Sequence, residues 1–193
     1  SRYRSDLNSS LARSIGAALR DMPDFVVGRE ALEGITHLLH DIVATETTRL
    51  LVVDAWVLGE TFSPEWALSL LEELLKLPSV TCCCPPPPGH ARAVPAWLEQ
   101  TDAIVLPPLA VPRTAALLQR ADLLVTGNTS LFQFAHLLRR PAVGVLEEEQ
   151  MAAYCRQDPK RVGIAYRRAP DADTVSGAVS KASALLEAAR SRE

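Results

Sequence analysis

"ADLLVTGNTSLFQFAHLLRRPAVGVL", residues 121–146, is the stretch that decides the fold class. It begins with a short apolar run, passes through a polar cluster, continues with apolar residues at helical spacing, and ends on a second apolar run after Pro141. Short, wholly apolar runs are typical of strands buried on both faces, and the spacing between them indicates an amphipathic helix. The stretch therefore predicts a strand, a helix and a parallel strand, which together form a βαβ unit.

The same alternation extends along most of the chain. Apolar runs predict six strands, at 49–54, 79–84, 103–106, 122–126, 142–146 and 161–166. A loop is expected directly after the first strand, and helices are expected at 63–77, around 92–100, and at 112–121, 130–140, 147–156 and 173–190. Ser63 is the expected N-cap of the 63–77 helix, with Pro64 at its first position. Helices alternating with buried strands predict an α/β fold, a Rossmann-like doubly wound six-stranded parallel sheet.

Two further helices, 7–20 and 29–43, precede the first predicted strand. We therefore divide the chain into a helical linker region, 1–45, that packs on the domain, and a Rossmann-like domain, 46–193. The commonest order of six such strands is 3-2-1-4-5-6, which makes the first and fourth strands neighbours. Ligands of such sheets bind at this switch point, outside the carboxyl ends of the strands.

Composition excludes several classes of protein. The 193 residues are 48% hydrophobic and 22% charged, which is enough apolar material for a sizeable core. The formal net charge is -3 and the basic residues are scattered, so no nucleic-acid partner is expected. No apolar run approaches the roughly 20 residues of a membrane span, and the first residues lack the features of a signal peptide. We therefore expect a cytoplasmic protein with no membrane span.

The cysteines and histidines do not predict a metal site. Cys82–Cys84 are consecutive and Cys155 is remote, a spacing that fits neither a zinc knuckle nor a disulfide framework. Neighbouring residues of a strand point to opposite faces, so three adjacent thiols cannot easily converge on one ion, with or without His90. His37 and His40 have a spacing that can bind metal, but this pair alone does not predict a site. Buried thiols in a core strand are the simpler interpretation.

The polar cluster Gly127, Asn128, Thr129 and Ser130 falls between the fourth strand and its helix, at the predicted switch point. The first turn of a helix has unpaired amides and a partial positive charge, and therefore favours a phosphate. Gly127 permits close approach, and the two hydroxyls add donors. Asn128 is equally explained as an ordinary N-cap. Neither a dinucleotide fingerprint nor a P-loop motif is present, and both interpretations of the cluster stay open.

Two other groups of residues are expected near this crevice. Asp54 and Trp56 follow the first strand, and Asp54 is either a crevice contact or a helix cap. Glu147–Glu149 follow the fifth strand, where they form an acidic first helical turn or contact a ribose.

Residues 121–146 resemble the donor-site segment of the family 9 glycosyltransferases, the heptosyltransferases of bacterial lipopolysaccharide synthesis. That segment has the pattern A-D-L, two hydrophobic residues, then D-T-G-x-x-H-x-A and x-P-hydrophobic-hydrophobic. Residues 50–75 and 101–125 are similar to the strands, loops and helices that precede it, and 3–16 resembles the linker helix entering the second domain. The resemblance covers nearly the whole chain.

This resemblance implies the carboxy-terminal half of a GT-B type glycosyltransferase, which binds the nucleotide-sugar donor. The acceptor-binding domain, and with it the catalytic base, belongs to the amino-terminal half, so the catalytic residues of such an enzyme are not among these. No metal is implied, because donor phosphates in this fold are neutralised by helix ends and basic side chains rather than by a carboxylate-held ion. No cofactor is implied, because the nucleotide-sugar is the donor substrate. The implied donor-binding residues are Asp54, Trp56, Gly127, Asn128, Thr129, Ser130 and Gln133.

The chain departs from the family pattern at several positions. Where the family has D-T-G-x-x-H, this chain has Asn128, Thr129, Ser130 and Gln133, so only the threonine is retained. The loop that carries a lysine in the family has Glu60 and no basic residue here. Two hypotheses follow. The chain is a donor-binding domain that needs a separate amino-terminal acceptor domain or partner, or it is a catalytically inactive glycosyltransferase-derived scaffold or protein-interaction module.

Overall fold

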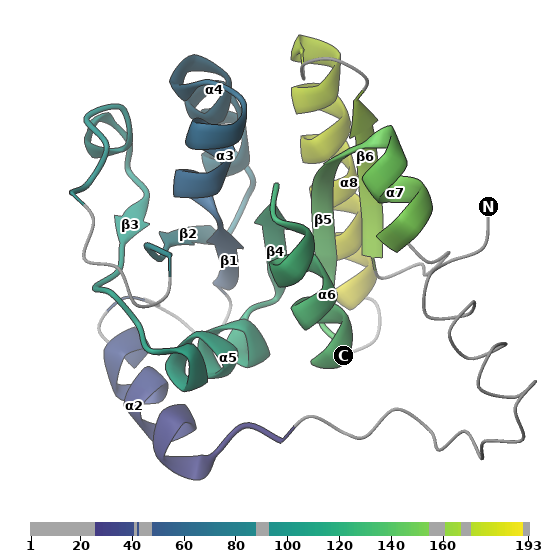
Figure 1. The fold of residues 1–193 in the computed structure, drawn as a ribbon. Helices are drawn as coiled ribbons and strands as arrows, with labels where there is room; N and C mark the ends of the chain where they lie inside the picture. The colour runs from purple at the N-terminus through teal and green to yellow at the C-terminus, as the bar shows by residue number, and fades with distance from the viewer. Residues whose placement is uncertain are drawn as a thin grey trace, which may run out of the picture.

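The computed structural model describes residues 26–40, 42, 48–87, 93–154, 161–166 and 171–190. Its centre is a six-stranded sheet in which every neighbouring pair is parallel (Figure 1). The strands are β1 (Arg49–Val53), β2 (Val80–Cys84), β3 (Ile104–Val105), β4 (Leu123–Thr126), β5 (Ala142–Glu147) and β6 (Arg161–Tyr166). Their order is β3-β2-β1-β4-β5-β6, which confirms the predicted order and places β1 beside β4.

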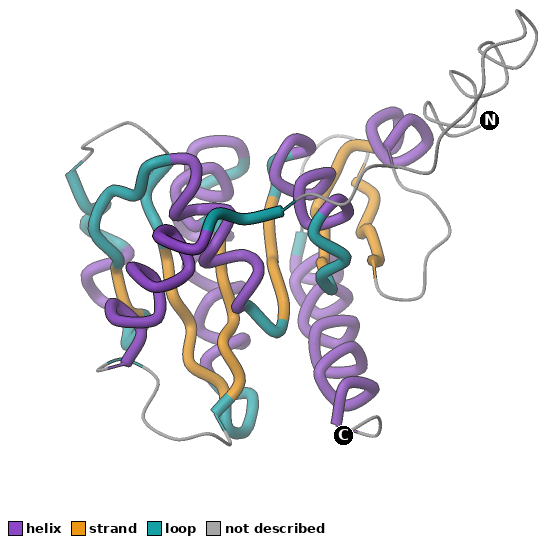
Figure 2. Tube along the Cα trace, turned by 90° about the horizontal axis from the view of Figure 1, so that it is seen from below, coloured by secondary structure: helices purple, strands orange, loops and turns teal. Residues whose placement is uncertain are grey.

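Helices cover both faces of the sheet (Figure 2). One face carries α3 (Ala55–Thr61), α4 (Pro64–Leu75) and α8 (Ala172–Arg190); the other carries α2 (Arg29–His40), α5 (Val111–Arg120), α6 (Thr129–Leu137) and α7 (Glu148–Tyr154). The predicted start of α4 is confirmed, because the Ser63 hydroxyl accepts a hydrogen bond from the Trp66 amide at 3.1 Å and Pro64 follows it.

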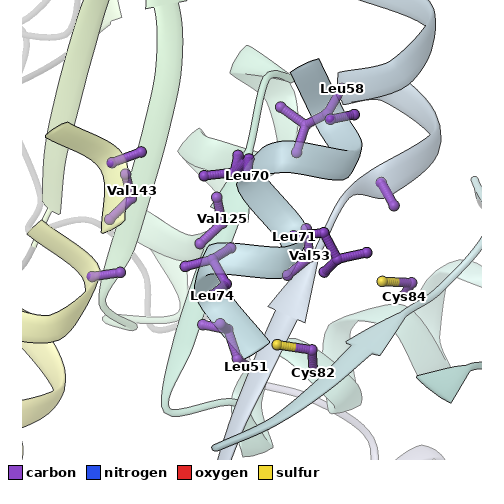
Figure 3. Close-up of a cluster of buried hydrophobic side chains, with 14 of the residues drawn as sticks. Leu51, Val53, Leu58, Leu70, Leu71, Leu74, Cys82, Cys84, Val125 and Val143 are labelled. Atoms are coloured by element: carbon purple, nitrogen blue, oxygen red, sulfur yellow. The ribbon is translucent and has the colours of Figure 1, made fainter. Parts of the chain in front are cut away.

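The core consists of two layers, one on each face of the sheet. Alternate residues of β1 enter different layers, because successive side chains of a strand point to opposite faces. Leu51 and Val53 pack under α4, where Figure 3 shows Val53 beside Leu71 and Leu51 near Leu74, whereas Leu50 and Val52 pack under α5. The cysteines of β2 follow the same rule, with Cys82 and Cys84 in the first layer and Cys83 in the second. This confirms the prediction that neighbouring thiols of this strand point to opposite faces of the sheet.

Two local predictions were wrong. The segment after β1, expected to be a loop, is the helix α3, and its apolar residues Trp56 and Leu58 are buried against the sheet. The helix expected around 92–100 is only a 3-10 turn, Leu98–Gln100, which begins with a 2.8 Å hydrogen bond from the Leu98 amide to the Pro95 carbonyl. The seven residues of α3 are too few for apolar periodicity to predict a helix, and burial of their apolar side chains stabilises it.

The helix α2 packs against α5. Ile35 and Leu39 of α2 are buried in the same layer as α5, and Arg120 of α5 donates to the Thr36 hydroxyl at 2.9 Å. The helix predicted at 7–20 lies outside the described residues, and the boundary between 45 and 46 stays a prediction.

Candidate functional site

The candidate site lies where β1 and β4 end. These strands are neighbours, with Val53 opposite Val125, and the Asp54 amide donates to the Val125 carbonyl at 2.9 Å. Residues that directly follow the two strands therefore meet at one edge of the sheet. This edge is the carboxyl end of the parallel strands, the position at which open α/β sheets bind ligands.

A short chain of hydrogen bonds joins the two strand ends. The hydroxyl of Thr126, which is fully buried, donates to Asp54 Oδ2 at 2.8 Å. The same hydroxyl oxygen accepts from the Asn128 amide at 2.9 Å. The end of β1 is thus held directly to the start of α6.

The carboxyl group of Asp54 is only 4% exposed. Burial raises the pKa of Asp54 to about 6, because the charged form loses its hydration. The hydrogen bond from Thr126 and the nearby Val57 amide lower this pKa, and the charge of Glu60 raises it. The Asp54 side chain makes no capping hydrogen bond of normal geometry to α3. Asp54 therefore changes its charge at a pH where an exposed aspartate is already fully ionised.

Asn128 is the N-cap of α6. Its side-chain oxygen accepts from the Ser130 amide at 2.8 Å and from the Leu131 amide at 3.3 Å. These are first-turn amides that would otherwise lack a partner within the helix. The capping interpretation of the polar cluster is confirmed, and two of the amides that a phosphate would use are already bound.

A cavity of about 230 Å³ opens at the meeting point of the two strand ends. Its polar lining includes Asp54, Asn128 and Ser130. The remaining lining residues are Val52, Val57, Pro85, Pro86, Pro87, Thr114, Leu117, Leu118, Leu124 and Leu131. Among the described residues, no lysine or arginine lines this cavity. The cavity is therefore mainly apolar, with a buried acid at one end.

A second, more open groove lies along α6. Thr129, Ser130 and Gln133 line it together with the apolar residues Val111, Leu131, Phe134 and Leu137. Val111 is 63% exposed and Leu137 is 39% exposed, so the groove has an apolar surface. The predicted donor-binding residues are thus divided between two openings, with Ser130 on the rim of both.

Two of the predicted donor-binding residues line neither opening. Trp56 is 3% exposed and its indole nitrogen donates to the Ala93 carbonyl at 3.4 Å, so the side chain packs in the core. A Cβ atom at Gly127 would lie 3.2 Å from both Leu58 and Phe62. The glycine is explained by this close packing against α3 and the residue after it.

Three parts of the site were not predicted from the sequence. Thr126 was expected at the end of the fourth strand, at the mouth of the crevice, but without its Asp54 partner. Thr114 was expected only as part of the 112–121 helix, and Pro85–Pro87 fall in none of the predicted strands or helices. The signal that was available is the proline run itself. A rigid segment directly after a central strand must pass the carboxyl edge of the sheet, where it forms a wall of the cavity.

The thiols and histidines show no sign of metal binding in the part of the chain that the structure describes, where no three potential ligands are grouped. Cys82–Cys84 are free and buried, and burial raises the pKa of Cys82 and of Cys83 to about 12. His37 and His40 lie exposed on α2. His90 and Cys155 lie outside the described residues. Within those residues, no helix is both long and apolar enough to cross a bilayer.

Comparison with solved structures identifies the kind of fold. No family model matches the chain, and no curated protein matches its sequence. E. coli ADP-heptose LPS heptosyltransferase II superposes with a TM-score of 0.63 and 12% sequence identity, over 88% of this chain and 55% of that one. The chain has a GT-B glycosyltransferase-like fold.

A weaker likeness is to Methanocaldococcus jannaschii UDP-GlcNAc 2-epimerase, with a TM-score of 0.47 and 11% identity over 95% of this chain and 52% of that one. The chain therefore spans about half the length of each of these two proteins. For a GT-B-like fold, the paired ends of β1 and β4 are the switch point of one Rossmann-like sheet.

Proposed function

We propose that this chain is a donor-binding domain of the glycosyltransferase type. It binds the diphosphate of a nucleotide-sugar at the start of α6, and it takes part in transfer only together with an amino-terminal acceptor domain or partner. The observation that carries the proposal is the position of Asn128, Thr129 and Ser130, which begin a helix at the switch point of a GT-B-like sheet. The likeness in fold supports the class of ligand.

The start of α6 offers a diphosphate three contributions. The helix carries a partial positive charge at this end. Thr129 and Ser130 add hydroxyl donors, and Ser130 is exposed. Gln133 lies one turn further along the same groove.

Three features keep the expected affinity low. Asn128 already occupies the amides of Ser130 and Leu131. The nearby charges are those of Asp54 and Glu60, which repel a diphosphate. No basic side chain lines the cavity in the described part of the chain. We therefore expect dissociation constants in the high micromolar to millimolar range, a binding free energy of about -4 to -6 kcal/mol. Salt should weaken the affinity further.

The test is a titration of the protein with ADP, UDP, GDP and their sugar conjugates, followed through backbone amide signals. Saturable shifts at residues 127–133 are expected, and the variant Thr129→Val should abolish them. The matched control is Thr36→Val on α2, which removes the same hydroxyl far from the site and should leave the shifts unchanged. Absence of shifts at several millimolar nucleotide, with the protein folded, contradicts the proposal.

A second candidate function is a scaffold that has lost its donor site. The observation that favours it is the completed capping of α6 by Asn128, which satisfies the helix start without any ligand. In that case no nucleotide perturbs residues 127–133, and replacing Thr129 has no binding consequence at all. The titration described above therefore distinguishes the two functions.

A further inference from the structure

We propose that the cavity between the ends of β1, β2 and β4 binds an uncharged, largely apolar molecule of one or two rings, held through a hydroxyl or amine that donates to Asp54. This ligand class differs from a nucleoside diphosphate. The inference goes beyond the proposed function and does not depend on it.

Size supports such a ligand. The cavity measures about 230 Å³, and an engineered apolar cavity of about 150 Å³ stays dry and binds benzene. The cavity therefore has room for a fused pair of rings. Most of the lining residues are apolar, so ordered water has polar partners mainly near Asp54, Asn128 and Ser130, and an apolar ligand displaces few well-bound waters from the rest.

The walls of the cavity come from four different parts of the fold. Val52 and Leu124 form its floor on the sheet, and both are almost fully buried. Leu117 of α5 and Leu131 of α6 form two sides, and Pro85–Pro87 form another. Because proline has a fixed φ and lacks rotamer freedom, the third side is rigid, which lowers the entropy lost on binding.

Asp54 supplies the polar contact. A carboxylate accepts about four hydrogen bonds; Thr126 occupies one of these positions, on Oδ2, and the Val57 amide interacts with the same carboxylate, which leaves positions for a ligand donor. Thr114, on the opposite wall, has its hydroxyl directed to the Ala110 carbonyl of its own helix at 3.3 Å. A ligand donor therefore gains most from Asp54.

Charge excludes an anion from the same place. In a mainly apolar cavity a negative charge would lose its hydration and meet Asp54, with Glu60 close by. No lysine or arginine among the described lining residues compensates for that loss. The cavity thus selects against the phosphate chemistry that the start of α6 attracts.

Three probes with the same rings separate these contributions. At pH 7.5, we expect 2-naphthol to bind saturably and to shift the amide signals of Leu117, Leu118 and Leu131. The methyl ether, 2-methoxynaphthalene, has no donor and should bind about tenfold more weakly, the loss expected for one hydrogen bond to a charged group. The anion 2-naphthoate should not bind in this cavity.

A matched pair of variants on α5 locates the binding. Thr114→Met fills the cavity from a lining position and should abolish 2-naphthol binding, whereas Val111→Met, one turn earlier and 63% exposed, should leave it unchanged. If Thr114→Met does not fold, Ser130→Phe at the exposed rim provides the second test and should weaken binding at least severalfold.

The inference is overturned if folded protein fails to bind 2-naphthol, if the ether or the anion binds as well as the phenol, or if filling the cavity has no effect. The nucleotide titration reports on residues 127–133 and on Thr129→Val, so either proposal can fail while the other stands.

Discussion

The ends of β1 and β4 occupy equivalent positions in neighbouring strands, yet they use their polar residues in opposite ways. Asn128 caps the helix that follows it, and its side-chain oxygen accepts hydrogen bonds from the amides two and three positions further on. Asp54 also precedes a helix, α3, but makes no capping hydrogen bond to it. Its carboxylate instead accepts a hydrogen bond from the Thr126 hydroxyl, which lies 72 positions away in the chain.

This difference separates a local role from a tertiary one. Asn128 stabilises α6 at little cost, because amide oxygens are good acceptors for first-turn amides and need no charge to be buried. Asp54 connects two strand ends, but its carboxylate is buried, and the raised pKa of about 6 reflects the cost of that burial. Only the second arrangement leaves a titratable group on the wall of a cavity.

The largest expected effect comes from disrupting β4, because its pairing with β1 brings the two strand ends together. Leu124 is 1% exposed and lies in β4 opposite Val52 on one side and Ala142 on the other. In Leu124→Asp, an unpaired buried charge costs several kcal/mol against a total stability of about 5 to 15 kcal/mol, so we expect no soluble folded protein. Circular dichroism and soluble yield measure this.

Val111→Asp is the control, because the same aspartate at a 63% exposed position should change stability by about 0.5 kcal/mol or less. A fully folded Leu124→Asp variant would contradict the placement of β4 in the core, and with it the comparison of the two strand ends.

The comparison also explains which features the sequence could predict. The strand order and the capping of α6 follow from apolar runs and from a capping residue beside its helix, which are signals within a few residues. Asp54 was left ambiguous, since its pairing with Thr126 depends on two strands becoming neighbours. The cavity was not predicted because its walls come from segments that only the folded sheet brings together.

Trp56 is a second residue whose position could not be predicted from its local sequence. A tryptophan after a strand that ends at a crevice is a reasonable candidate for stacking on a ligand. The short helix α3 instead turns this side chain into the core, where the Ala93 carbonyl accepts from its indole. The direction of a side chain after a strand depends on the structure of the next few residues, and here that structure was wrongly predicted to be a loop.

The next effect concerns the charge of Asp54. Its pKa is about 6 in the folded protein and 3.8 in the absence of burial. Between those values the folded state binds more protons than the unfolded state, so the wild-type free energy of unfolding falls as pH rises through this window and levels off above it. In Asp54→Asn this decline is absent. The stability of the variant relative to wild type should therefore increase by about 2 to 3 kcal/mol between pH 4 and pH 7.5.

Urea denaturation at several pH values measures this change. Glu99→Gln, the same carboxyl-to-amide change at an exposed residue, is the control because that side chain carries no burial penalty. If the two variants show the same dependence on pH, Asp54 is not the source of the cost.

A smaller loss of stability is expected on substitution of Thr126, whose hydroxyl joins the two strand ends. Thr126→Val keeps the shape of the side chain but removes the bond to Asp54 and the acceptor of the Asn128 amide. We expect a destabilisation of about 1 to 3 kcal/mol, because buried polar groups are left unpaired. In the background of Asp54→Asn the same change should lower the free energy of unfolding by less, because no buried carboxylate then loses its hydrogen-bond donor. Equal costs in both backgrounds would show that the two residues are not coupled.

The smallest expected change in stability is at Asn128, where two readouts should move in opposite directions. Asn128→Ala removes the cap of α6 and should lower the free energy of unfolding by about 1 kcal/mol. The same change releases the amides of Ser130 and Leu131, which the Asn128 side chain now occupies. Released first-turn amides point towards an anion at the helix start, so nucleoside diphosphate affinity should rise severalfold while stability falls.

Asn128→Ser separates the two effects, because serine is a comparable N-cap. This variant should keep both the stability and the weak nucleotide affinity of the wild type. Thermal unfolding gives the first quantity, and amide shifts at residues 127–133 during an ADP titration give the second. If Asn128→Ala loses stability without any gain in affinity, the amides of α6 are not the anion contact. The start of this helix then has a purely structural role.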